Sequence, residues 1–277
     1  MSPITAPWVR SRKRSHGDAA LVMITAYDEP SARLADAAGV DLILVGDSVA
    51  NVVLGHEDTL QVTTEQMAHH VGAVARAKPQ ALIVGDLPWM SYHVSVLESL
   101  RNAASLIRAG AGCVKLEGGQ IRVETVRKIV EAEIPVMGHL GLTPQSVHAQ
   151  GGYRVQGKTA DAAQSLLDDA RALEAAGCFA IVLEGIPADL AAKVTEALAI
   201  PTIGIGAGAA CDGQVLVFHD LLGLSGRKPP KFVRAYAQLG PVITEAIANY
   251  AKDVRSGDFP GPDETYAGPE GLTDSLS

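Results

Sequence analysis

The chain has 277 residues, of which 47% are hydrophobic and 19% are charged. This length suits one domain with a sizeable core, and the apolar content excludes global disorder. The net charge of −8 at pH 7 disfavours a nucleic-acid partner, because the phosphates would be repelled by the protein's overall field. A small-molecule substrate is therefore the better expectation.

The sequence contains no run of 18 or more apolar residues and no hydrophobic stretch of the secretory type near its N-terminus. We therefore expect a soluble, cytoplasmic protein without a membrane partner. Cys113, Cys178 and Cys211 are odd in number and far apart, without the C-x-x-C spacing of zinc or redox sites. We expect all three to be reduced and mostly buried thiols.

Residues 1–20 form an N-terminal arm ahead of the first expected strand. Arg10, Arg12, Lys13 and Arg14 give this arm a basic character that resembles a weak organellar transit segment. An ordinary solvated arm is the preferred interpretation.

Short apolar runs alternate with helical patterns along residues 21–256, which is typical of successive β-α units around a parallel sheet. Each apolar run is nearly continuous in Val, Ile, Leu and Ala, as expected for strands that are buried on both faces. The eight expected strands cover residues 22–27, 42–46, 81–85, 113–116, 135–138, 179–183, 202–205 and 215–218. Eight units in one chain of this length predict a (β/α)₈, or TIM, barrel.

Helices are expected between these strands. Apolar residues recur at helical spacing along 96–107 and 163–173, and Thr63 followed by Gln66 predicts a capping box at a helix start. Glycines that end a helix before the next strand are expected at Gly39, Gly110 and Gly177. Residues 257–277 are rich in Gly, Pro, Asp, Glu and Ser, which predicts a tail without a core of its own.

Polar residues follow the second to sixth expected strands, where barrels build their active sites. They are Asp47 and Ser48, Asp86, Lys115 and Glu117, His139, and Glu184. Four of these are carboxylates, which would repel one another at one opening, so a bound divalent cation is the simplest way to keep them ionised. Asp47 and Asp86 are spaced to bind Mg²⁺, with substrate and water as further ligands, although either Asp could instead cap a turn.

Glu117 would reach the metal ion through a water, or would pair with Lys115. Because side chains alternate across a strand, we expect these two residues to point to different faces, which disfavours their pairing. Lys115 could bind a substrate carboxylate, act as a Schiff-base nucleophile or serve as a structural counter-charge. Glu184 could act as a general base or form a simple ion pair, and His139 could bind substrate or only satisfy a loop.

Two other motifs are less informative. His69 and His70 are adjacent on an expected helix and cannot share a face, so they are excluded as metal ligands. The glycine-rich run 204–208 lacks the spacing of a nucleotide-binding loop, and we interpret it as a place where the backbone approaches another group closely, with anion binding as the less favoured alternative.

Six motifs appear in chain order: VGDS at Asp47, GDLPW at Asp86, VKLEGG at Lys115, GHLGLTPQSVHAQGGYRVQGK from Gly138, LEGIP at Glu184 and IGIGAGAACDGQVLV from Ile203. Together they closely resemble the ketopantoate hydroxymethyltransferase family over residues 23–256. The resemblance implies that a 2-oxo acid chelates Mg²⁺ held by Asp47, Asp86 and, as an outer or partial ligand, Glu117. It further implies that Ser48 and Lys115 hold the substrate carboxylate.

In such enzymes Glu184 would remove the C3 proton of 3-methyl-2-oxobutanoate. The enolate would then take a one-carbon unit from 5,10-methylenetetrahydrofolate, giving 2-dehydropantoate and tetrahydrofolate in pantothenate synthesis. The family assembles as a ring-like homo-oligomer, usually a homodecamer. Three alternatives are a metal-dependent lyase or mutase of the isocitrate lyase and phosphoenolpyruvate mutase kind, a Schiff-base aldolase using Lys115, and a silent scaffold. The sequence has no K-x-C-G-H run, which carries the catalytic cysteine of the lyase and mutase kind. A silent scaffold would have no reason to place four carboxylates at one rim.

Overall fold

The computed structural model describes residues 3–226 and 228–274, in which eight parallel strands close into a barrel. The strands are β1 (Leu21–Thr25), β2 (Leu42–Val45), β3 (Leu82–Asp86), β4 (Cys113–Glu117), β5 (Val136–Gly141), β6 (Ala180–Glu184), β7 (Thr202–Ile205) and β8 (Gly213–Leu216). Each strand pairs with the next in sequence, and β1 pairs with β8 to complete the ring. The expected (β/α)₈ barrel is confirmed, with every predicted strand overlapping an observed one.

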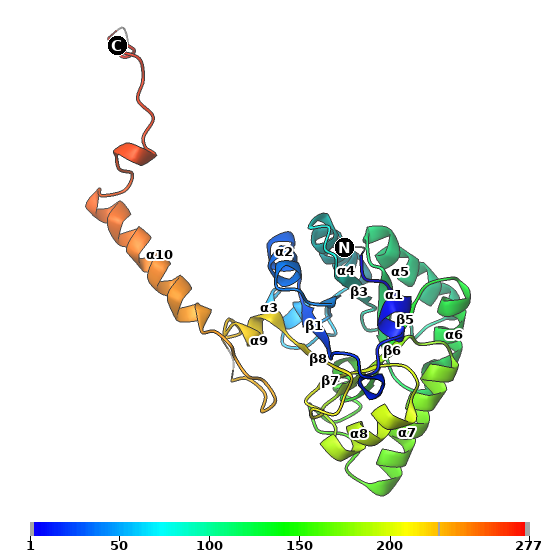
Figure 1. Cartoon of the computed structure of the whole chain (residues 1–277). Coiled ribbons are helices and arrows are strands. Elements are labelled where there is room, and N and C mark those ends of the chain that lie inside the picture. The colour runs from blue at the N-terminus through cyan, green and yellow to red at the C-terminus, as the bar shows by residue number, and fades with distance from the viewer. Residues whose placement is uncertain (1–2, 227, 275–277) are drawn as a thin grey trace.

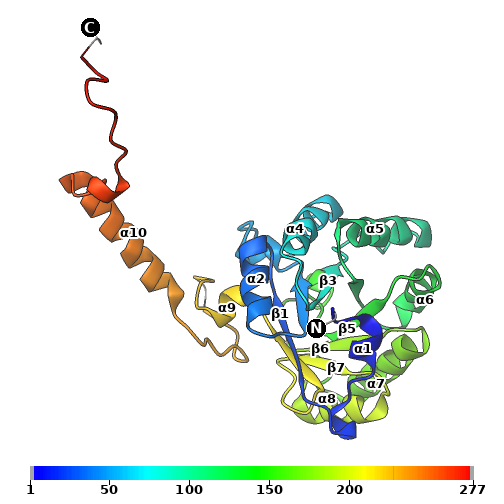
Figure 2. The ribbon, with the colours of Figure 1, turned by 45° about the horizontal axis from the view of Figure 1, so that its top comes forward.

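Helices surround this ring in the order that the sequence predicts (Figures 1 and 2). The longer ones are α2 (Glu29–Ala37), α4 (Thr64–Arg76), α5 (Val96–Ala109), α6 (Val123–Glu131), α7 (Ala160–Ala175), α8 (Ala188–Ala197) and α10 (Leu239–Ser256). Shorter helices are α1 (Ala6–Arg10), α3 (Val49–Val52) and α9 (Phe218–Leu221), with 3₁₀ turns at Arg14–His16, Gln120–Arg122, Pro144–Ser146 and Pro262–Glu264.

Local sequence signals explain where these helices begin and end. Thr63 and Gln66 form the predicted capping box, in which each side chain accepts a hydrogen bond from the other's backbone N–H. Gly110 ends α5 in the left-handed conformation, with φ 117°, which a residue with a Cβ adopts only with strain. The predicted helix boundaries are thus confirmed at both kinds of terminus.

Apolar side chains form two cores, one between the strands and the outer helices and one inside the barrel. The inner core includes Leu42, Val84 and Met137 from the strands, and it is continued by Ala6 and Val9 of α1. The helix α1 therefore closes the barrel at the end opposite the strand C-termini. All three cysteines are buried and free, as predicted, and burial raises the pKa of each thiol.

The expectation of a solvated N-terminal arm is wrong at Lys13, whose side chain is buried. Its ammonium group lies 2.9 Å from Asp212 Oδ2 and donates hydrogen bonds to the carbonyl oxygens of Thr195 and Ile200. Asp212 also accepts from the backbone N–H groups of Arg14 and Thr202. This network anchors the arm to the start of β8, and no local pattern could predict it because the partners lie about 200 positions away.

We expect Lys13→Met to lower the free energy of unfolding by about 3–5 kcal/mol, because it leaves the Asp212 carboxylate buried without its cation. Urea denaturation of this variant and of wild type measures the difference. Arg10→Met, which changes an exposed residue of the same arm, is the matched control and should shift stability little. Equal stability of the Lys13 variant and the control would contradict a structural role for this ion pair.

The C-terminal helix α10 has no buried residue and projects away from the barrel (Figures 1 and 2). Its exposed apolar side chains are Val242, Ile243, Ile247, Tyr250 and Val254. The described part of the tail, residues 257–274, also contains no buried residue. Among residues 3–226 and 228–274, no helix is long and apolar enough to cross a membrane.

Candidate active site

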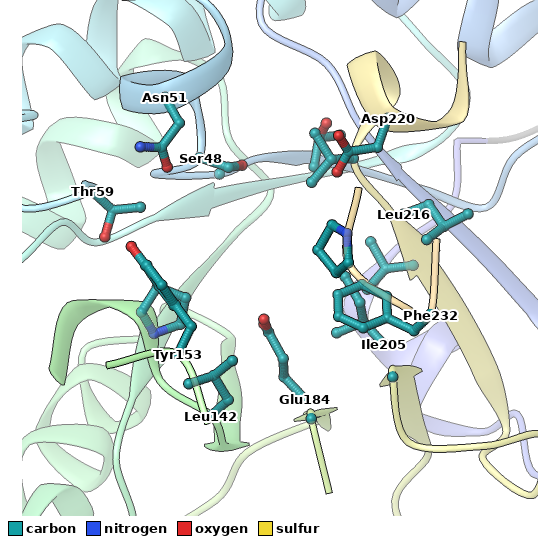
Figure 3. A pocket seen from close by; sticks show the side chains of 18 of the residues that line it. Ser48, Asn51, Thr59, Leu142, Tyr153, Glu184, Ile205, Leu216, Asp220 and Phe232 are labelled. Atoms are coloured by element: carbon teal, nitrogen blue, oxygen red, sulfur yellow. The ribbon is translucent and has the colours of Figure 1, made fainter. Parts of the chain in front are cut away.

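The predicted site residues line one cavity of about 1020 Å³ at the carboxyl ends of the strands. They are Asp47, Ser48, Asp86, Lys115, Glu117, His139 and Glu184, contributed by β3 to β6 and by the turn after β2. Five of them are buried, whereas Glu184 and Ser48 are partly exposed toward the opening (Figure 3). The sequence therefore identified the residues that the barrel brings together.

Asp47, Asp86 and Lys115 form the innermost part of this site. The β3–β4 register places Asp86 beside Lys115, and the Asp86 Oδ1 and Lys115 Nζ atoms are 2.8 Å apart. Asp86 Oδ2 accepts a hydrogen bond of 3.0 Å from the backbone N–H of Asp47. This contact fixes the end of β3 against the turn that carries Asp47.

Burial and repulsion by neighbouring carboxylates raise the pKa values of both aspartates. For Asp47 the main cause is desolvation, followed by the charges of Asp86 and Glu117, and the pKa lies well above its usual range. For Asp86 desolvation also raises the pKa, while Lys115 opposes this. Burial lowers the pKa of Lys115, but the three carboxylates outweigh it and raise the pKa overall. Lys115 is thus held as a cation.

His139 lies between two carboxylates. Its Nδ1 is 3.3 Å from Glu117 Oε1, and its Nε2 is 3.3 Å from Glu184 Oε2. Desolvation and the Lys115 charge lower the pKa of His139, but the two glutamates outweigh them and raise it to about 9. The raised pKa favours the charged imidazolium, which places a positive group within ion-pair distance of the Glu184 carboxylate.

The expectation that Lys115 and Glu117 point to different faces is wrong. His139 Nδ1 lies 3.4 Å from Lys115 Nζ and 3.3 Å from Glu117 Oε1, so both side chains enter the same site. Residues two apart in a strand share a face, because the side-chain period is two. Lys115 and Glu117 therefore lie on one face of β4, and Leu116 between them lies on the other.

Sequence reasoning missed Gln145 and Tyr92, which hold the carboxylates in place. The Gln145 side-chain amide donates to Asp47 Oδ2 at 3.0 Å, and its backbone N–H donates to Glu117 Oε2 at 3.0 Å. Its side-chain oxygen accepts a hydrogen bond from the Tyr92 hydroxyl, which in turn accepts from the Glu117 N–H. Gln145 lies inside the long motif from Gly138, but it does not end a strand, and a position at the end of a strand was the signal that marked the other site residues.

Two glycines allow close approaches at the rim. Gly141 has φ 96°, and a Cβ there would lie 2.2 Å from the Glu184 carbonyl oxygen. Gly206 has φ 62°, and a Cβ there would lie 2.7 Å from the Phe232 ring. The interpretation of the glycine-rich run 204–208 as a place of close backbone approach is confirmed.

The floor of the cavity offers oxygen donors of the kind that a divalent cation prefers. Asp47, Asp86 and Glu117 are buried and line this cavity, and desolvation, followed by the charges of Asp86 and Glu117, raises the pKa of Asp47. Within residues 3–226 and 228–274, no group of three or more His, Cys, Asp or Glu side chains is arranged to hold a metal ion. Two direct carboxylate ligands with substrate and water completing the shell match the habits of Mg²⁺.

The fold and the site define a (β/α)₈-barrel protein with a carboxylate-rich, lysine-containing centre at the strand C-termini, the usual place for catalysis in such barrels. A family model described as ketopantoate hydroxymethyltransferase matches residues 4–262. The chain belongs to this family.

Two relatives from this family are similar to the chain over most of their length. The chain is 57% identical over 257 residues to 3-methyl-2-oxobutanoate hydroxymethyltransferase 2 of Bradyrhizobium diazoefficiens, covering 93% of this chain and 88% of the relative. It is 50% identical to the 3-methyl-2-oxobutanoate hydroxymethyltransferase of Syntrophomonas wolfei over the full length of both.

Similar solved structures include 2,3-dimethylmalate lyase, at TM-score 0.60 and 20% identity, covering 95% of this chain and 92% of that one. Another is phosphonopyruvate hydrolase in complex with oxalate and Mg²⁺, at TM-score 0.58 and 13% identity, covering 98% and 94%. Because the identities are low, these two structures support the barrel fold alone.

Proposed function

We propose that this enzyme transfers a hydroxymethyl group from 5,10-methylenetetrahydrofolate to 3-methyl-2-oxobutanoate, giving 2-dehydropantoate and tetrahydrofolate in cytoplasmic pantothenate biosynthesis. One observation carries the proposal: a buried pair of carboxylates, Asp47 and Asp86, lies in the same cavity as a charged lysine and Glu184. Such a site can bind a chelating 2-oxo acid and also remove a proton from it. The names of the relatives at 50–57% identity agree with this activity.

Asp47 and Asp86 would hold Mg²⁺ directly, and Glu117 would hold it through a water. Bound there, the ion would polarise the keto group and favour loss of the neighbouring proton, a Lewis-acid effect worth several kcal/mol. Lys115 and Ser48 would bind the substrate carboxylate. Ser48 is oriented for this by the Tyr27 hydroxyl, 2.8 Å from its Oγ.

Glu184 would remove the proton from C3 of the 2-oxo acid, since its carboxylate lies 3.3 Å from His139 Nε2 and faces the cavity. The carbanion electrons form a bond to the methylene carbon of the folate as one of its two carbon–nitrogen bonds breaks. A water replaces the second nitrogen on that carbon and supplies the hydroxyl oxygen. The C3 proton and one proton of the water end on the two folate nitrogens, so the overall change consumes one water and releases tetrahydrofolate.

Lys115 has a raised pKa and forms an ion pair with Asp86, so its amine is kept protonated. This disfavours a Schiff-base aldolase, because a protonated amine cannot attack a carbonyl. A lyase or mutase of the phosphoenolpyruvate mutase kind shares the fold, but the family match favours hydroxymethyl transfer.

One assay tests the proposal. The enzyme is given 3-methyl-2-oxobutanoate and methylenetetrahydrofolate, with Mg²⁺ or with a chelator, and 2-dehydropantoate is quantified. We expect product with Mg²⁺, loss of product with the chelator and recovery when Mg²⁺ is restored. Absence of product under all conditions would reject the activity, and full activity in the chelator would reject the requirement for Mg²⁺. Borohydride trapping of a substrate adduct on Lys115 would support the aldolase instead.

Gln145→Leu should weaken Mg²⁺ binding by about tenfold or more, because the Asp47 carboxylate loses the side-chain amide that supports it, while the backbone N–H to Glu117 is kept. Titration calorimetry measures this affinity. Gln150→Leu is the matched control, since Gln150 bonds Gly141 and Thr143 in the same region without touching a carboxylate. Wild-type affinity in the Gln145 variant would contradict a positioning role for this residue.

We further propose that the chain forms a homo-oligomer, in keeping with the ring-like decamers implied by the family resemblance. The exposed apolar side chains of α10 support this, since such a face is normally covered by protein. In sedimentation experiments wild type should exceed the 28.8 kDa of one chain, and Ile247→Glu should shift it to smaller species. Lys252→Ala on the same helix is the control. A wild type that sediments as a single chain would refute the proposal.

A further inference from the structure

We propose that the outer part of the same cavity binds the folate co-substrate, with Tyr153 and Phe232 contacting its pteridine ring and Arg154, Lys228 and Lys231 contacting its anionic glutamate tail. The inference rests on the proposed function, because it assigns the second substrate of that reaction to a place in the site. All five residues line the cavity and lie outside the carboxylate centre.

The cavity is larger than a small 2-oxo acid alone requires. Its volume of about 1020 Å³ matches the upper end of the range of about 300–1,000 Å³ for pockets that bind one drug-sized molecule. A small 2-oxo acid held near Asp86 and Lys115 would fill only the floor. The space above Glu184 then remains for a larger second substrate.

The cavity changes in charge from its floor to its mouth. The floor is buried and contains the carboxylates, whereas Arg154, Lys228 and Lys231 are exposed at the opening. Glu57 and Asp220 also line the cavity, so the mouth is mixed in charge, with three cations against two carboxylates among these residues. In a chain of net charge −8, a local group of cations is the feature that can attract a dianionic tail.

Two aromatic side chains lie on opposite sides of Glu184, as Figure 3 shows. Tyr153 is 55% exposed and Phe232 is 37% exposed, so their ring faces are available to a ligand. Phe232 is seated against the end of β7 because Gly206 has no Cβ to displace it. Aromatic faces of this kind bind flat heterocycles by stacking.

The chemistry sets the orientation of the folate. Its methylene carbon is attached to the pteridine ring and must come within about 3–3.5 Å of C3 of the 2-oxo acid for the bond to form. Since Glu184 removes the C3 proton, the ring must lie near Glu184, between Tyr153 and Phe232. The tail then extends toward the mouth, where the three cations lie.

Steady-state kinetics test the two parts separately. Phe232→Ala should raise the KM for methylenetetrahydrofolate about tenfold by losing one stacking contact. The triple variant Arg154→Ala, Lys228→Ala, Lys231→Ala should raise it roughly three- to tenfold, because exposed ion pairs are individually weak. In both variants the KM for the 2-oxo acid and the rate of C3 proton exchange, which needs no folate, should stay at wild-type values. Lys193→Ala, an exposed lysine of α8, is the control.

Calorimetry with two probes then separates ring from tail. Tetrahydrofolate carries both, whereas 6-methyltetrahydropterin carries only the ring. Phe232→Ala should weaken both probes, and the triple variant should weaken tetrahydrofolate alone. If wild type forms product but the variants keep the wild-type KM for folate, this assignment is overturned while the proposed function stands. Equal weakening of both probes by the triple variant would overturn the placement of the tail. If wild type forms no product, the proposed function itself fails.

Discussion

Glu184→Gln is expected to abolish exchange of the C3 proton of 3-methyl-2-oxobutanoate while leaving Mg²⁺ and 2-oxo acid binding largely intact. The substituted amide keeps the size of the side chain but cannot accept a proton, and general-base catalysis contributes on the order of 10²–10⁴ in rate. Product formation should fall by at least the same factor, because carbon–carbon bond formation requires the carbanion.

Exchange is measured by proton NMR in deuterated water, with Mg²⁺ and without folate. Glu57→Gln is the matched control, because Glu57 lines the same cavity but is exposed at its rim. We expect this control to exchange at the wild-type rate. Unchanged exchange in the Glu184 variant would reject Glu184 as the base and direct attention to another group near C3.

Asp86→Ala is expected to weaken Mg²⁺ binding by more than about 100-fold. Loss of a residue that only supports a metal ligand usually costs about 10–100-fold in affinity, and Asp86 is proposed as a direct ligand. The substitution also leaves Lys115 buried beside one fewer carboxylate, which should lower the free energy of unfolding by about 3–5 kcal/mol.

Calorimetry measures the affinity, and urea denaturation without metal measures the stability. Asp86→Asn separates the two effects, because the amide preserves the shape and the hydrogen bond from the Asp47 N–H while removing the charge. Wild-type Mg²⁺ affinity in either variant would exclude Asp86 as a ligand.

The strand-end rule found the chemical groups of the site but not their supports. Asp47, Asp86, Glu117 and Glu184 each follow or end an apolar run, so the sequence alone placed them at one rim. Gln145 lies in the 3₁₀ turn Pro144–Ser146, where its backbone N–H reaches Glu117 of β4, and no periodic signal marks such a position. The network through Gln145 therefore required coordinates.

Pairing partners were the weakest part of the sequence interpretation. Lys115 pairs with Asp86 because the β3–β4 register sets them side by side, and register between strands is not encoded in either strand alone. Lys13 was expected in solvent, yet its side chain is buried and forms an ion pair with Asp212, just before β8. In both cases the deciding contact joins segments far apart in sequence.

The sequence by itself determined the eight-fold alternation of strands and helices, the helix boundaries and the acidic residues at the strand ends, because these depend on local periodicity and on residues within a few positions. Only the tertiary structure decided which charges pair, which side chains support the carboxylates, and how Tyr153 and Phe232 come to lie on either side of Glu184. The physical reason is that closure of the barrel sets distances between segments that local preferences leave undefined.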